Sequence, residues 1–178
     1  NASVLIVAPG AQIHATGTSS SPIIFTSILD NIEPGTIISP NLGATQNGYW
    51  GGVIILGNAE ISAGNGGATA DIEGIPAGTA SYGGSNNADN SGEFQYCSIR
   101  HGGIVIGNGN EINGLTLGGV GNGTTIDHVE VVGNVDDGIE FFGGTANAMN
   151  VYVENADDDS IDWTESWSGS LTNAYISN

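Results

Sequence analysis

Basic side chains are almost absent from this sequence, which has one Arg and no Lys among 178 residues but 19 acidic residues. The formal net charge of −18 at pH 7 argues against nucleic acids as partners, because binding to phosphate groups needs several cations. Docking on anionic membranes is disfavoured for the same reason. A single Arg cannot balance the acidic side chains by ion pairing, so we expect metal cations to take part.

Cysteine and long apolar runs are scarce as well. The single cysteine, Cys97, permits no internal disulfide, and we expect it to be a small core residue. No apolar run approaches the roughly 20 residues that a membrane-spanning helix requires, which predicts no insertion into a bilayer. Hydrophobic residues nevertheless make up 39% of the chain and recur in short clusters, a pattern typical of a folded protein. The acidic composition, rich in Asn, Gly, Thr and Ser, favours an extracellular or cell-surface location.

A repeat of about 22 residues runs through the C-terminal part of the sequence. Shifting residues 126–145 by 22 positions superposes Val129 on Val151, Asp137 on Asp159 and Phe141 on Trp163. Each copy alternates apolar and polar residues over a short stretch bounded by Gly, Asn or Asp, which is typical of strands and turns. A constant shift that superposes like residues predicts parallel coils, because hairpins would reverse every second strand.

These coils predict an all-β fold, a right-handed parallel β-helix, in which superposed residues stack about 4.8 Å apart. Residues 1–178 suit a single domain of this kind, and we expect a fragment, or one unit of a longer chain or polymer. The N-terminal half is less regular: residues 70–76 are read as a coil strand, and loop insertions are expected at roughly 28–49 and 76–92. The expected inward ladders are Ile99/Val131/Val153/Ile176 and Ile106/Phe141/Trp163.

Several sequence runs resemble one family of secreted or surface bacterial proteins. They include PIIFTS (22–27), NGYWGGVIILGNA (47–59), IEGIP (72–76), SIRHGG (98–103), residues 109–132 and DDGIEFFGGT (136–145). The resemblance covers almost the whole chain and implies a right-handed parallel β-helix with an extracellular location. Most members carry no assigned activity, so the resemblance supplies no catalytic residues.

Carboxylates fall into columns when the repeat is stacked. The 22-residue shift places Asp136 over Asp158, Asp137 over Asp159 and Glu140 over Asp162. Like charges opposite each other in a ladder are destabilising, so such groups either share a proton or coordinate a cation. Ca²⁺ takes six to eight oxygen ligands in irregular geometry, and these six residues are therefore our candidate Ca²⁺ ligands. The alternative is that the acids are solvated turn residues.

Three further side chains are interpreted separately. His101 falls in the Asp136 column if Ile104 is aligned with Ile139, which would make it a metal ligand or, more simply, a hydrogen-bonded turn residue. Trp163 alternates inward and is read as core. Trp167 is free to be exposed, and is our candidate for contact with a glycan.

Two enzyme chemistries known on β-helices remain as alternatives. A polygalacturonase-like hydrolase would use Asp137 with Asp158 and Asp159, but no Gly-His-Gly or Arg-x-Lys motif follows them. A Ca²⁺-dependent polysaccharide lyase would need Arg100 as its base, although an ion pair with Glu130 or Asp136 suits Arg100 better.

The sequence therefore favours a non-enzymatic function. We expect an extracellular structural or adhesive β-helix module stabilised by Ca²⁺, with surface glycans or further copies of itself as partners. Copies are candidates because the open end of a β-helix exposes unpaired backbone groups, onto which another copy could stack head to tail as a filament.

Overall fold

The computed structural model describes residues 3–63, 67–107 and 109–178, and within these ranges all regular structure is β. No helix in the described part of the chain is long and apolar enough to span a bilayer. The strands are β1 (Leu5–Val7), β2 (Ile13–Thr16), β3 (Ile23–Phe25), β4 (Val53–Leu56), β5 (Ala70–Asp71), β6 (Ser81–Tyr82), β7 (Gly92–Arg100), β8 (Leu115–Gly118), β9 (Thr125–Asn134), β10 (Ile139–Phe142), β11 (Asn147–Ala156), β12 (Ile161–Thr164) and β13 (Leu171–Ser177).

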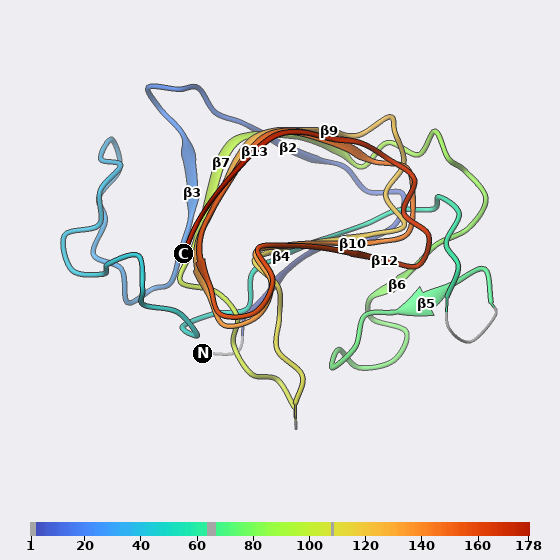
Figure 1. The fold of residues 1–178 in the computed structure, drawn as a ribbon, viewed down its shortest axis with the longest axis horizontal. Coiled ribbons are helices and arrows are strands. Elements are labelled where there is room, and N and C mark those ends of the chain that lie inside the picture. The colour runs from blue at the N-terminus through green and yellow to red at the C-terminus, as the bar shows by residue number, and fades with distance from the viewer. Residues whose placement is uncertain (1–2, 64–66, 108) are drawn as a thin grey trace.

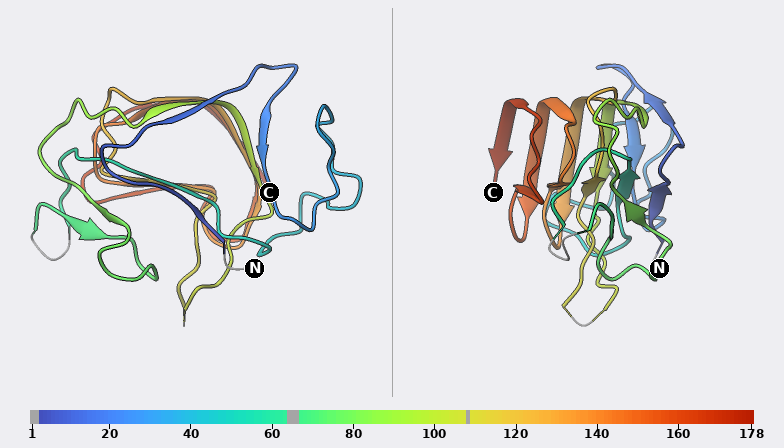
Figure 2. Two further views of the ribbon diagram at one scale, coloured as in Figure 1. Left: turned by 180° about the vertical axis from the view of Figure 1, so that it is seen from behind. Right: turned by 90° about the vertical axis from the view of Figure 1, so that its right-hand side faces the viewer.

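Two parallel sheets enclose the interior of the molecule (Figure 1). The first sheet has the order β1-β4-β8-β10-β12, and the second has the order β13-β11-β9-β7-β2, with β3 also pairing with β7. From β7 onward the chain alternates between the two sheets, so each turn of the chain adds one strand to each, as the edge-on view in Figure 2 shows. This is a parallel β-helix, which confirms the predicted fold class.

The pairing register confirms the repeat over the regular coils. Val129 pairs with Val151, Ile139 with Ile161, and Glu140 with Asp162, each 22 residues apart. The expected ladder of Ile99, Val131, Val153 and Ile176 is present in the second sheet.

The second expected ladder is wrong in one member. Phe141 pairs with Trp163 on one side, but its other neighbour is Leu117 rather than Ile106. Ile106 lies outside the strands and packs against a separate apolar cluster. The misassignment arose because the chain between β7 and β8 leaves the coil as a loop, which the sequence pattern of residues 104–106 does not reveal.

His101 also does not lie in the column of Asp136, where the alignment of Ile104 with Ile139 would place it. Arg100 pairs with Val132, so His101 lies level with Gly133 rather than with Asp136. Both residues adopt a positive φ, 62° and 68°, and Asn155 one coil further has a φ of 55°. These three residues therefore form a column of left-handed corners, a conformation that glycine adopts freely and asparagine tolerates.

Apolar side chains form two clusters on opposite faces of the first sheet. The interior cluster fills the coil and includes Phe94, Ile99, Leu117 and Phe141. The second cluster contains Ile54, Leu56, Ile72, Ala80, Tyr82 and Ile112. The segment between β4 and β7 supplies its outer layer with an antiparallel β5–β6 hairpin, which lies outside the first sheet in Figure 1. Residues 70–76 were thus wrongly expected to be a coil strand.

The strands β12 and β13 form one edge of the first and second sheets, respectively. Two inward-facing residues that a further coil would cover are exposed there: Trp163 by 60% and Ile176 by 49%. Tyr175, which faces outward beside the half-buried Tyr152, is exposed by 67%. Trp163, expected in the core, is level with buried Phe141 but has no strand on its other side within the described residues.

Candidate functional site

The acidic residues gather where two consecutive coils turn into the first sheet. One turn lies between β9 and β10 and the other between β11 and β12, and backbone bonds lock them together. The Gly138 N–H donates to the Asp159 carbonyl at 2.9 Å, and the Asp159 N–H donates to Asp137 Oδ1 at 2.9 Å. Glu140 and Asp162 follow on paired strands, on the outer face of the sheet, because Ile139 and Phe141 alternate inward.

Five of the six predicted ligands come together in two overlapping groups. In one group, carboxylate oxygens of Asp136, Asp137 and Asp158 all lie within 4.8 Å of one another. In the other, oxygens of Asp137, Glu140 and Asp162 do so. Asp159 belongs to neither group: its side chain is exposed, and its contribution is the backbone N–H that holds Asp137.

Burial and mutual repulsion raise the pKa values of three of these carboxyls. Burial, together with the neighbouring charges of Asp136, Asp162 and Asp158, raises the pKa of Asp137 to about 7, against the lowering effect of the Asp159 N–H. Burial likewise raises the pKa of Glu140 to about 8. The pKa of Asp136 is also raised, again mainly by burial. A bound cation would offset this repulsion and favour the ionised forms.

Asn113 completes this site and was missed by the sequence reasoning. It is 6% exposed, its Nδ2 donates to Glu140 Oε2 at 2.7 Å, and its Oδ1 finds no hydrogen-bond partner among the residues that the structure describes. A buried carbonyl oxygen without a partner is costly unless a ligand satisfies it. A signal did exist: Leu115 pairs with Ile139, so Asn113-Gly114 occupies the place of Asp137-Gly138 one coil earlier.

A cavity of about 310 Å³ opens at this cluster. Besides Asn113, its lining includes Glu140, Asp136 and Asp158, together with Thr116, Glu73 and Glu111. Every titratable side chain in this lining is a carboxylic acid. The site is therefore rich in oxygen ligands and contains no basic side chain, a combination suited to a hard divalent cation.

Trp167, our candidate glycan contact, is half-buried rather than freely exposed. Its ring stacks on Phe141 with centroids 4.3 Å apart, and its Nε1 donates to the Ala146 carbonyl at 3.0 Å. Trp163 is the exposed indole instead. We expected Trp163 to be buried and Trp167 to be exposed, and the structure shows the reverse, because the open edge of the sheets leaves Trp163 uncovered.

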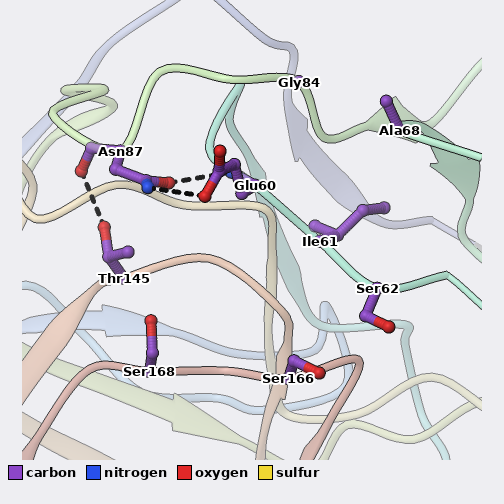
Figure 3. A pocket seen from close by; sticks show the side chains of 9 residues that line it. All are labelled: Glu60, Ile61, Ser62, Ala68, Gly84, Asn87, Thr145, Ser166 and Ser168. Carbon is purple, nitrogen blue, oxygen red and sulfur yellow. Dashed lines mark hydrogen bonds between the residues drawn. The ribbon is translucent and has the colours of Figure 1, made fainter.

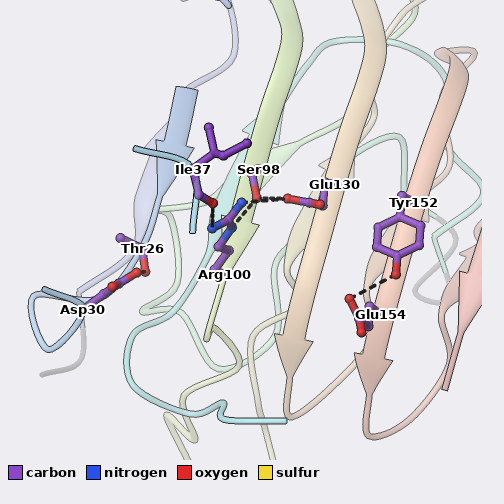
Figure 4. Close-up of polar contacts among 8 residues, drawn as sticks. All are labelled: Thr26, Asp30, Ile37, Ser98, Arg100, Glu130, Tyr152 and Glu154. Atoms are coloured by element: carbon purple, nitrogen blue, oxygen red, sulfur yellow. Dashed lines mark hydrogen bonds and ion pairs between the residues drawn. The ribbon is translucent and has the colours of Figure 1, made fainter. Parts of the chain in front are cut away.

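Arg100 and His101 are both engaged away from the acidic cluster. Arg100 forms an ion pair with Glu130 at 3.1 Å, one of its two expected partners, and also donates to Ser98 and to the Ile37 carbonyl (Figure 4). His101 is buried, and its Nδ1 lies 2.6 Å from the Gln46 carbonyl oxygen. Arg100 thus fastens the loop of residues 26–49 to the second sheet, and His101 is a hydrogen-bonded turn residue.

A second polar cavity, of about 400 Å³, shares no lining residue with the acidic one. Glu60 and Asn87 bond each other twice across it: the Glu60 N–H donates to Asn87 Oδ1, and Asn87 Nδ2 donates to Glu60 Oε2. Thr145 donates to the Asn87 carbonyl (Figure 3). These groups satisfy one another, whereas the acidic cavity contains an unsatisfied oxygen.

Comparison with known proteins gives a family but no individual relative. The profile of a family described as a pectate-lyase-like β-helix domain matches residues 1–178. Neither a search of curated proteins nor a search of solved structures found a match.

Proposed function

The chain belongs to the pectate-lyase-like β-helix domain family, and from this premise we propose that it is an extracellular structural or adhesive module whose acidic cavity binds Ca²⁺. The observation that supports this most strongly is the convergence of the carboxylates of Asp137, Glu140 and Asp162. The buried Asn113 lies against this group, since its Nδ2 donates to Glu140 Oε2, and its Oδ1 has no hydrogen-bond partner among the described residues. Ca²⁺ is favoured over Mg²⁺ because it accepts many oxygen ligands in irregular geometry.

The location of the acidic cluster gives the proposed cation a structural role. The acidic cluster joins two coils, since Asp136 and Asp137 precede β10 whereas Asp158 precedes β12. A cation held by both turns would cross-link neighbouring coils and remove the repulsion between them. Ligands that bind only the folded state stabilise it by mass action, so Ca²⁺ would act on the stability of the module.

The geometry is less suited to the hydrolase alternative. An inverting pair of carboxyls stands about 6.5–9.5 Å apart, so that a water molecule fits between them. Asp137 and Asp158 instead bring oxygens within 4.8 Å of each other, and the Asp159 side chain is exposed outside both groups. The lyase alternative loses its only base, because Arg100 is bonded to Glu130 on the second sheet.

Adhesion and self-association would use other surfaces. The exposed Trp163, Tyr175 and Ile176 lie on edge strands, which are templates for further β-structure and support stacking of a second copy. For glycan contact, the exposed Trp163 is better placed than Trp167. Size-exclusion chromatography over a range of concentrations tests the stacking, and discrete monomers throughout would remove it.

Isothermal titration with CaCl₂ tests the central part of the proposal. We expect a dissociation constant of about 10⁻⁴–10⁻³ M, typical of extracellular Ca²⁺ modules. Glu140→Gln should weaken binding at least about tenfold, because it removes a charged ligand. Glu33→Gln is the matched control, since Glu33 is an exposed carboxylate on the loop of residues 26–49. Absence of binding heat, or equal weakening by both variants, would contradict the proposal.

A further inference from the structure

We propose that the chain has a second binding site, an apolar cavity against the outer face of β1 that takes a neutral aliphatic molecule. The volume of this cavity is about 460 Å³, compared with about 310 Å³ for the acidic cavity, and among the described residues only Ile112 lines both. Small-molecule sites commonly have volumes of about 300–1,000 Å³ and mostly apolar walls. This inference does not depend on the proposed Ca²⁺ binding.

Three parts of the chain enclose the cavity. The outer face of β1 forms one wall, and the loops of residues 74–79 and 104–106 form the others. Four aliphatic side chains of these walls pack against the second apolar cluster and yet are only partly buried: Val4, Ile6, Ile75 and Ile106. The cluster is therefore incompletely covered on this side, and an apolar molecule in the cavity would shield these side chains from water.

Gly74 allows the two loops to meet beside the cavity. Its φ of 75° is a left-handed conformation that suits glycine, and a Cβ at this position would lie 2.6 Å from Ile106 Cδ1. A larger residue would therefore push the loops apart. The loops thus pack closely against each other, and the cavity is bounded by this contact rather than by a gap between them.

The lining of the cavity favours a neutral ligand. Among the described residues it contains no ionisable side chain, and its one side-chain hydroxyl belongs to Thr79. An ionic ligand would lose its hydration here without gaining a partner, and the net charge of −18 would repel anions in particular.

The same lining favours a hydrocarbon chain over water or a sugar. A buried water molecule needs roughly two to four polar partners, which these walls do not supply. Sugar rings bind by stacking on aromatic side chains, and none lines the cavity among the described residues. The Val and Ile walls suit an aliphatic chain, and the Thr79 hydroxyl is available to a terminal hydroxyl of the ligand.

Methyl-detected NMR titration with 1-octanol tests this site. We expect saturable shifts of the methyl signals of Ile6, Val105 and Ile106, with a dissociation constant of about 10⁻⁴–10⁻³ M for a ligand of this size. Octanoate has the same number of carbons but a charged end. At about pH 7.5 it should bind at least about fivefold more weakly, because the acidic chain repels it.

Val105→Trp blocks the cavity from its rim. Val105 is 55% exposed, so a larger side chain fits there without displacing the apolar cluster, and the indole would occupy the space of the ligand. This variant should bind 1-octanol at least about tenfold more weakly. Ile38→Trp is the matched control and should keep the wild-type affinity, because Ile38 is 79% exposed and does not line the cavity. The methyl spectrum of each variant without ligand verifies its fold.

Several results would overturn the proposal. Absence of saturable shifts with 1-octanol would do so, as would shifts centred on the exposed Ile28 and Ile38, which indicate non-specific partitioning. Equal binding of octanoate, or unchanged binding by Val105→Trp, would also contradict it. If Val105→Trp does not fold, the wild-type comparison of 1-octanol with octanoate still decides. EDTA should leave the affinity for 1-octanol unchanged, so failure of this site and failure of the proposed Ca²⁺ site are separate results.

Discussion

One row of residues on the outer face of the first sheet changes from apolar to acidic along the β-helix. The pairing register aligns Ile6, Ile54, Thr116, Glu140 and Asp162 at the same position of five successive strands. Toward one end Ile54 is completely buried in an apolar cluster. Toward the other end Glu140 is 8% exposed although it is a carboxylic acid.

This difference shows that the residues packed against the outer face of the sheet, rather than the strand itself, determine whether an apolar or an acidic side chain is accommodated at this position. Over Ile54 the segment between β4 and β7 supplies Ile72, Ala80 and Tyr82, so an apolar side chain is buried among apolar neighbours. Over Glu140 the cavity lining adds the polar Asn113, Glu111 and Glu73 to the apolar Ile72 and Phe142. The same backbone thus offers an apolar contact at one end and, in our account, a cation site at the other.

The largest effect is expected from moving an acid to the apolar end. Ile54→Asp would bury a carboxylate without a partner or a cation, and it should lower the free energy of unfolding by about 3–5 kcal/mol. Urea denaturation measures this loss. Ile54→Val, the matched control, should cost only about 0.5–1.5 kcal/mol. If both substitutions cost the same, the cover does not discriminate between the two kinds of side chain.

An intermediate effect is expected from pH when no cation is present. The pKa of Asp137 is raised to about 7 and that of Glu140 to about 8, so the folded state binds more protons than the unfolded state between about pH 4 and 8. The free energy of unfolding should therefore fall as pH rises through this window. After allowance for solvent screening, we expect a loss of about 2 kcal/mol between pH 5 and pH 8 in EDTA.

Urea denaturation at a series of pH values measures this fall. Saturating Ca²⁺ should reduce it, because the cation replaces the protons at high pH. Glu140→Gln should also reduce it in EDTA, since one of the two titrating groups is gone. If the free energy of unfolding instead rises with pH in EDTA, the carboxylates of the cluster do not repel one another as the structure indicates.

The smallest expected effect is a difference in Ca²⁺ binding between substitutions at two adjacent acids of one turn, Asp158 and Asp159. Asp158→Asn should weaken Ca²⁺ binding about tenfold, because the Asp158 carboxylate lies within 4.8 Å of Asp136 and Asp137. Asp159→Asn should change the dissociation constant less than about twofold, since only its backbone N–H contacts the cluster. Titration calorimetry compares them under one set of conditions. A larger loss in Asp159→Asn would favour its predicted role as a ligand.

The sequence predicted the regular coils well because identical spacing leaves identical registers. From β9 onward the 22- and 23-residue shifts place Val129, Val151 and Ala174 in one ladder, as the structure confirms. The N-terminal half was predicted poorly, since its insertions contribute an outer layer rather than coil strands. The local pattern of Ile104 and Ile106 could not show that this segment packs against the outside of the first sheet.

The acidic site was predicted in outline, and its remaining details depend on tertiary contacts. The repeat alone brings Asp137 and Glu140 next to the acids of the following coil. It does not distinguish Asp158, whose side chain joins the cluster, from Asp159, whose backbone N–H does. Asn113 was missed because its coil is longer, with 24 residues between the paired Leu115 and Ile139 instead of 22.

Thermal unfolding of the wild-type chain with and without Ca²⁺ tests the central claim most directly. With a dissociation constant of about 10⁻⁴–10⁻³ M, 10 mM CaCl₂ should stabilise the folded state by about 1.4–2.7 kcal/mol relative to EDTA. For a domain of this size, such a gain raises the melting temperature by about 3–10 °C. The same melting temperature in CaCl₂ and in EDTA would contradict the account.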